Sequence, residues 1–103
     1  MAIIEVGKAN FESEVLKSEA PVLADFNAGW CGPCRAMKPM LEELAEANPG
    51  YKIVSIDIDA EDELADDYDV SSIPCLVVFK DGEEVNRSVG LIPKDAIAAL
   101  VEG

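Results

Sequence analysis

Blocks of apolar and polar residues alternate along the chain and predict strands and helices in turn. Val22–Asn27 is mostly apolar, as expected for a strand buried on both faces. After position 31 apolar residues recur at helical spacing, so a helix is expected to run to about Ala47, with Pro39 interrupting it. Asn48-Pro49-Gly50 supplies a clear signal for its end.

The other apolar blocks complete an α/β pattern. Further strands are predicted over Ile3–Val6, Lys52–Asp59, Cys75–Lys80 and Glu83–Val89. The last two flank Asp81-Gly82, a strong signal for a two-residue hairpin turn. Helices between the early strands imply parallel crossovers, and the hairpin adds an antiparallel pair.

Three shorter helices are expected between and after these strands. Asn10 is predicted to cap the first, and Pro93 is placed in the first turn of the last. The inner faces are expected to be Phe11, Val15 and Leu16 in the first helix, Leu64, Ala65 and Tyr68 in the acidic one, and Ile97, Leu100 and Val101 in the last.

Length and composition limit the classes of protein that fit. A chain of 103 residues is expected to form a single domain, residues 1–103, without a membrane span, because no apolar run approaches about 20 residues. The net charge of −13 argues against binding nucleic acid or an anionic membrane surface. Three cysteines and no export signal at the start indicate a reducing compartment, so we expect a cytoplasmic protein.

An acidic segment, residues 57–69, was a candidate cation site. It holds eight acidic residues and no basic one. However, it lacks the glycine that a calcium loop needs at its sixth position, and Ile58 is expected to point into a core. A solvated acidic face is the better interpretation. The chain also has no histidine, which excludes chemistry that depends on imidazole.

The strongest candidate for chemistry is Cys31-Gly32-Pro33-Cys34, preceded by Trp30, between the apolar strand and the long helix. At a helix start, free backbone N–H groups and the helix dipole stabilise an anion, so a thiol there ionises more easily. Pro33 fits the first turn without losing a hydrogen bond, and it stiffens the segment. The two thiols could be a redox pair or half of a metal site.

The whole chain resembles the thioredoxin family. The residues that carry the resemblance are Asp25-Phe26, Ala28, Trp30-Cys31-Gly32-Pro33-Cys34, Pro39, Asp57-Ile58-Asp59, Ile73-Pro74, Phe79-Lys80-Asp81-Gly82 and Gly90. A lone C-x-x-C is weak evidence, but WCGPC in this order of elements with a later Ile-Pro is specific. The resemblance implies the thioredoxin fold, a central mixed sheet flanked by four helices. A lowered thiol pKa in the C-x-x-C motif is already known for this family.

The resemblance also implies roles for individual residues. Cys31 is expected to be the attacking thiolate, nearer the surface, and Cys34 the more buried resolving thiol. Asp25 matches the family's buried acid, which could take the Cys34 proton; the alternative is that it only bonds nearby backbone. Gly32 and Pro33 tune the couple.

A docking surface is implied as well. The residues expected to border it are Trp30, Ile73, Pro74 and Gly90, with Ile73-Pro74 as the family's cis-proline segment. The implied function is a protein-disulfide reductase, a monomer without cofactor or metal. Its implied partners are disulfide-containing target proteins and a thioredoxin reductase.

Three residues depart from the family pattern. Asn27 stands where a second tryptophan is common, which predicts a more polar, less shielded site. Ser55 replaces a common lysine beside the buried acid, so the Asp25 pKa is expected to be higher. Cys75 replaces a common threonine and has three interpretations: a buried apolar filler, a third redox thiol, or a metal ligand.

Alternatives to the reductase stay open from sequence. One is an oxidant or isomerase of the same fold, which the reduction potential decides. Another is a non-catalytic binding or clamp subunit, and a third is metal or iron–sulfur binding through Cys31, Cys34 and Cys75. Arg35 and Lys38 are either ordinary solvated residues or modest contributors to thiolate stability.

Overall fold

The computed structural model describes residues 2–47 and 49–103, and its sheet matches the predicted order of elements. Five strands occur in these residues: β1 (Ile4–Glu5), β2 (Val22–Asn27), β3 (Lys52–Asp57), β4 (Cys75–Lys80) and β5 (Glu83–Val89). They lie in the order β1-β3-β2-β4-β5. β3 runs parallel to β1 and β2, whereas β4 is antiparallel to β2 and β5, which gives the expected mixed sheet.

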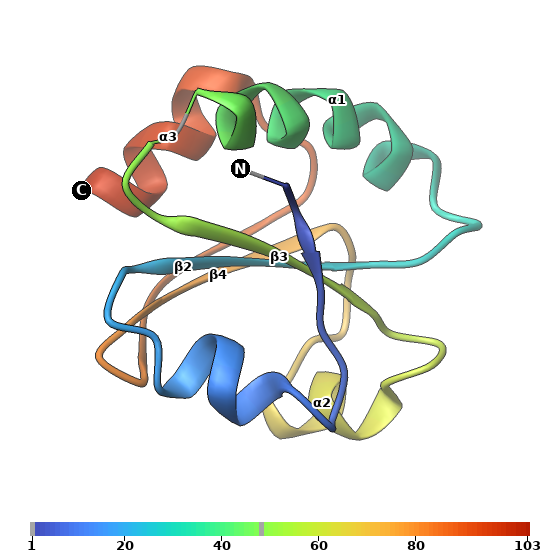
Figure 1. Cartoon of the computed structure of the whole chain (residues 1–103). Coiled ribbons are helices and arrows are strands. Elements are labelled where there is room, and N and C mark those ends of the chain that lie inside the picture. The colour runs from blue at the N-terminus through green and yellow to red at the C-terminus, as the bar shows by residue number, and fades with distance from the viewer. Residues whose placement is uncertain (1, 48) are drawn as a thin grey trace.

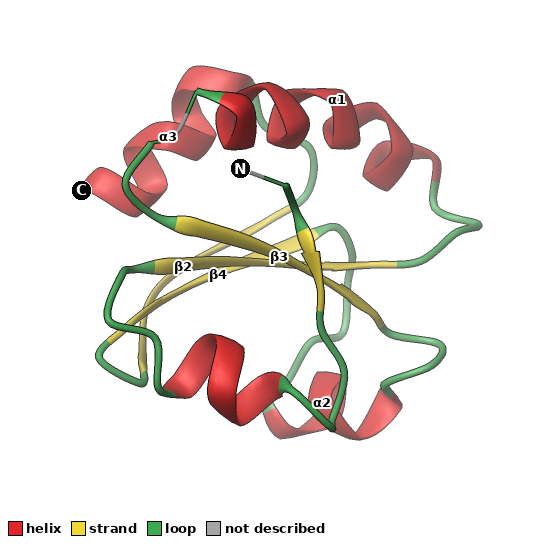
Figure 2. Ribbon diagram, viewed as in Figure 1, coloured by secondary structure: helices red, strands yellow, loops and turns green. Residues whose placement is uncertain are grey.

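Helices cover both faces of the sheet (Figures 1 and 2). α1 (Gly32–Glu46) and α3 (Lys94–Glu102) lie on one face, and η1 (Glu12–Leu16) and α2 (Asp62–Asp67) lie on the other. Successive side chains of a strand point to opposite faces, so β2 contributes to two cores. Leu23 packs with α1 and α3, while Ala24 and Phe26 pack in the core beneath η1 and α2.

α1 includes Pro39 without ending there. Its buried face consists of Met37, Leu41 and Leu44 with Cys34 and Ala45. Pro39 lies on the exposed side, where water can satisfy the carbonyl that loses its partner. Asn48, part of the predicted stop signal, lies outside the described residues, as does Met1.

The first helix differs from its prediction. It is a π-helix whose N-cap residue is Phe11, without a side-chain cap. Asn10 is not that cap, because its Oδ1 instead accepts a hydrogen bond from the Gly7 N–H at 2.8 Å. The Asn10 side-chain oxygen, which was predicted to cap the helix, therefore closes the turn that follows β1.

Two other predicted boundaries were wrong. β3 ends at Asp57 instead of Asp59, because the Asp57 carboxylate accepts the Asp59 N–H at 2.9 Å and turns the chain. Pro93 is the N-cap of α3, one residue before the first turn. The hairpin turn is confirmed: Asp81 and Gly82 have φ of 53° and 82°, as a type I′ turn requires.

Candidate active site

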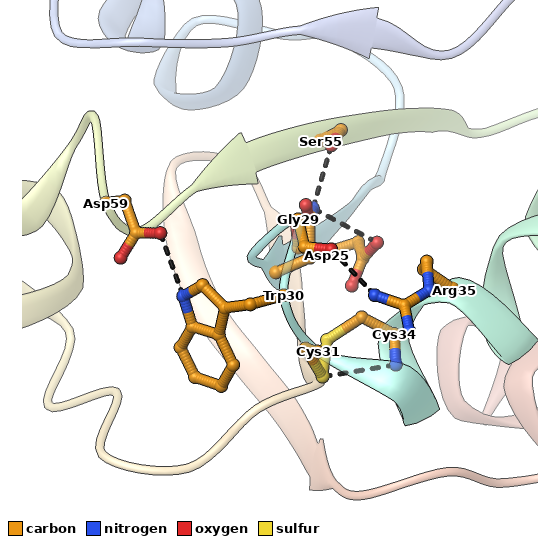
Figure 3. Close-up of a disulfide and its surroundings, with 9 residues drawn as sticks. Asp25, Gly29, Trp30, Cys31, Cys34, Arg35, Ser55 and Asp59 are labelled. Atoms are coloured by element: carbon orange, nitrogen blue, oxygen red, sulfur yellow. Dashed lines mark hydrogen bonds between the residues drawn. A yellow bond between two sulfur atoms is a disulfide. The ribbon is translucent and has the colours of Figure 1, made fainter.

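β2 delivers the cysteine motif to the start of α1. After β2 ends, the Cys31 N–H donates to the Ala28 carbonyl at 3.1 Å and tightens the connection. Cys31 is the N-cap residue of α1, and its Sγ accepts a hydrogen bond from the Cys34 N–H at 3.2 Å. Cys31 and Cys34 form a disulfide across this first turn (Figure 3). A Cys31 thiolate would therefore face a backbone donor and the positive end of the helix dipole.

The two cysteines do not differ in burial as expected. Cys31 is 4% exposed and Cys34 is 5% exposed. They pack with Ala28, and the partly buried Ile58 and Ile73 lie against them. In this disulfide form, the more accessible Cys31 that the resemblance implied is therefore not seen.

Asp25 is a buried acid near the motif, as the sequence indicated. It lies in β2, is 7% exposed, and its Oδ1 has no hydrogen-bond partner among the residues that the structure describes. Burial raises the pKa of its carboxyl to about 7, the Asn27 amide opposes that rise, and Glu5 adds to it. A carboxyl with this pKa can accept or release a proton near neutral pH.

The Asn27 and Ser55 departures turn out to be in contact. The Asn27 Nδ2 donates to the Ser55 Oγ at 2.8 Å and approaches the Asp25 Oδ2 at 3.3 Å. It also donates to the Asp25 backbone carbonyl at 2.9 Å. The parallel register places Asp25 opposite Ser55, which is why residues far apart in sequence meet here. The polar surroundings expected from Asn27 are confirmed.

A cavity of about 670 Å³ opens over this group of residues. Asp25, Asn27, Cys34 and Ser55 line it, and Arg35 and Lys38 of α1 contribute basic side chains to its wall. The Arg35 guanidinium donates to the Gly29 carbonyl at 2.8 Å, which ties α1 to the preceding loop. Asp25 and Cys34 thus line the same cavity.

Trp30 is exposed beside the disulfide. Its side chain is 66% exposed, and the indole Nε1 donates to the Asp59 Oδ2 at 2.9 Å (Figure 3). The sequence did not indicate that Asp59 is a hydrogen-bond partner of Trp30, because Asp59 was predicted to lie at the end of a strand in an acidic segment. Its only signal was its place in the family pattern.

The second loop at the site comes from the start of β4. The Ile73–Pro74 peptide bond is cis, as the resemblance implied. The Gly90 N–H donates to the Pro74 carbonyl at 2.8 Å, so these two residues lie together. Gly90 has a φ of +99°, a conformation that favours glycine.

Cys75 follows Pro74 but packs away from the disulfide. It is 1% exposed and belongs to the core beneath η1 and α2, opposite Phe26 in the sheet. Ile58 and Ile73 pack against both this core and the disulfide cluster. Burial raises the pKa of the Cys75 thiol, which keeps it protonated. These contacts support the buried-filler interpretation.

Residues 2–47 and 49–103 contain no group of three or more cysteine, histidine or acidic side chains placed to hold a metal ion. Nor do they include a helix long and apolar enough to cross a membrane. A mixed α/β fold with a C-x-x-C disulfide at the start of a helix is typical of thiol–disulfide oxidoreductases.

Comparison with known proteins identifies the family. The thioredoxin family model matches residues 2–103. Thioredoxin from Bacillus subtilis (strain 168) is 51% identical over 102 residues, covering 98% of this chain and 96% of that protein. Thioredoxin from Chlamydia trachomatis is 47% identical over 96 residues, covering 93% and 92%. A solved mutant thioredoxin from Halobacterium salinarum NRC-1 matches with a TM-score of 0.88 at 38% identity, covering 99% of this chain and 93% of that one.

The chain belongs to the thioredoxin family. It is a dithiol redox carrier, and Cys31 and Cys34 fit the family's WCGPC motif. The binding-subunit alternative is not favoured by these findings.

Proposed function

We propose that the protein reduces disulfides of target proteins through the Cys31–Cys34 couple. The observation that carries this proposal is the position of the Cys31 Sγ, at the N-cap of α1 and within 3.2 Å of the Cys34 N–H. In the reduced protein, the Cys31 thiolate attacks one sulfur of a target disulfide. This forms a mixed disulfide and releases the other target sulfur as a thiolate.

The second step closes the internal disulfide. Asp25, as a carboxylate, takes the proton of the Cys34 thiol, and the resulting thiolate attacks the Cys31 sulfur. The bond between Cys31 and the target breaks, so the target leaves as a thiolate that takes up a proton. Two electrons have then passed to the target. The pKa of about 7 and the shared cavity support Asp25 in this role.

The docking surface in this proposal consists of Trp30, Ile73, Pro74 and Gly90. Support comes from the exposed indole and from the hydrogen bond that joins Gly90 to Pro74. An extended target segment would use the backbone near Pro74, while the indole covers part of it. Gly32 and Pro33 tune the couple from between the cysteines.

The cellular setting is part of the same proposal. A thioredoxin reductase returns Cys31 and Cys34 to the dithiol, and the single-domain monomer works in the cytoplasm. The family membership supports the reductase as partner. The buried, protonated Cys75 fits a compartment in which unpaired thiols stay reduced.

Trapping mixed disulfides tests the function directly. Cys34→Ser leaves Cys31 able to attack but removes the resolving thiol, so covalent complexes with targets should accumulate. Gel electrophoresis without reductant and mass spectrometry identify them. Cys31→Ser is the matched control, because it keeps the same number of thiols but lacks the attacking one. If Cys34→Ser traps no more protein than Cys31→Ser, the reductase proposal is wrong.

A further inference from the structure

Asn27 and Ser55 form a hydrogen-bonded pair that no step of the proposed reaction uses. The Asn27 amide joins the Asp25 Oδ2 at 3.3 Å to the Ser55 Oγ at 2.8 Å. A third bond, to the Asp25 backbone carbonyl at 2.9 Å, fixes the amide over its own strand. The two amide hydrogens are shared among these three acceptors, of which the Asp25 Oδ2 is the most distant, and together they hold the amide beside the Asp25 carboxyl.

We propose that Asn27 is a positioning residue for Asp25, held in place by Ser55, so that one carboxyl oxygen is fixed by a hydrogen bond and the other is left to accept a proton. The inference rests on the proposed role of Asp25 as proton acceptor. It adds which residues hold that acceptor in place.

The two carboxyl oxygens differ in a way that fits this arrangement. Oδ2 is the oxygen that Asn27 approaches, whereas Oδ1 is buried and has no hydrogen-bond partner. A buried polar atom without a hydrogen-bond partner destabilises the folded protein, so its presence calls for an explanation. Because Asn27 occupies Oδ2, Oδ1 is the oxygen left to accept a proton from Cys34, which lines the same cavity of about 670 Å³ as Asp25.

The charged groups around Asp25 do not replace Asn27. Glu5 of β1 faces the carboxyl with the same charge, and Glu42 of α1 also lines the cavity. Arg35 and Lys38 line the cavity from α1, but Arg35 is bonded to the Gly29 carbonyl. β4 places the apolar Leu76 opposite Asp25. The Asn27 amide is the one partner that lowers the Asp25 pKa against burial and Glu5.

The short side chains of Asn27 and Ser55 also line the cavity. Water entering this cavity would give the Asp25 carboxyl a route for its proton to bulk solvent. The amide and the hydroxyl therefore do two things together: they orient the carboxyl and leave it a route to solvent.

The test is a titration of the Asp25 carboxyl by carbon-13 NMR in the oxidised protein, where the active-site thiols do not titrate. Asn27→Leu removes the donor at similar volume, and we expect the Asp25 midpoint to rise by about one pH unit. Ser55→Ala leaves Asn27 less firmly held, so a smaller rise is expected. Asn86→Ala is the matched control: its amide bonds the Leu100 carbonyl on another face, and the midpoint should not move.

The outcomes separate the two proposals. An Asp25 midpoint that is unchanged or lower in Asn27→Leu overturns the positioning role, and Ser55→Ala decides if Asn27→Leu does not fold. In rapid-mixing kinetics, the closing of the internal disulfide should be slowed at pH 6 in Asn27→Leu, and the loss should shrink as pH rises and Asp25 ionises. If Asp25→Asn leaves that step unchanged while Asn27→Leu still moves the midpoint, the proton-acceptor role fails but the positioning role stands.

Discussion

Replacing Asp25 by asparagine should make the oxidised protein more stable than the parent at alkaline pH and leave its stability nearly equal to that of the parent at acid pH. The carboxyl is buried, and burial raises its pKa from 3.8 to about 7. Asparagine has nearly the same shape and never carries the charge. The substitution therefore isolates the free energy of holding a carboxylate in this site.

The sign follows from proton binding in the two states. Between pH 3.8 and about 7 the folded protein keeps the Asp25 proton that the unfolded chain releases. The stability due to the neutral carboxyl is thus fully present below pH 3.8, the pKa in the unfolded chain. It is lost as pH rises through about 7, the pKa in the folded protein. Each unit of pKa difference corresponds to about 1.4 kcal/mol, so the full loss is about 4 kcal/mol. The variant escapes that loss.

Urea unfolding followed by far-UV circular dichroism measures the effect, without reductant so that the disulfide stays closed. The free energies of unfolding of parent and Asp25→Asn should nearly coincide at about pH 3.5 and differ by about 4 kcal/mol at about pH 8.5. The exposed Asp66→Asn variant is the control for removing one negative charge from an acidic protein. Parallel curves for parent and Asp25→Asn across this range would refute the buried-carboxyl argument.

Three further substitutions test packing and backbone. Cys75→Ala should lower the free energy of unfolding by about 1 kcal/mol and leave the rate of insulin reduction unchanged, since the thiol is buried away from the disulfide; a large rate change would restore the third-thiol interpretation. Gly90→Ala should lower the free energy of unfolding in urea by about 1–2 kcal/mol, because a φ of +99° is strained for alanine. Steric overlap adds nothing, since the added Cβ meets no atom within 4 Å. In urea unfolding, Met37→Ala should cost about 2–5 kcal/mol and the half-buried Met40→Ala clearly less, and equal losses would contradict the assigned face of α1.

Local sequence rules predicted the elements that depend on local physics. The apolar run at Val22–Asn27 became β2, and Asp81-Gly82 formed the hairpin turn with both φ values positive. They failed where a side chain had two possible partners. Asn10 could cap a helix or close the preceding turn, and the Gly7 N–H took its oxygen. Asp57 had the alternation of a strand residue, yet its carboxylate ended the strand.

The candidate site was predictable to the same degree. WCGPC located Cys31 and Cys34 because the motif is contiguous and lies at a helix start. The contact between Asn27 and Ser55 was not predictable, since it depends on the register of β2 and β3 across 28 positions of sequence. The partnership of Trp30 with Asp59 likewise depends on where two separate loops end. Each departure from the family pattern was visible alone, but their joint effect needed the fold.

The central place of β2 in the sheet has a consequence for motion. β2 is bonded to β3 on one side and to β4 on the other, and its first five residues are buried. Amide protons in such a strand exchange with deuterium only when the whole molecule opens, whereas the two-residue edge strand β1 can open alone. The cysteine loop is thus attached to a strand that we expect to open slowly. We expect β2, which holds the cysteine loop, to stay folded while target proteins bind and dissociate.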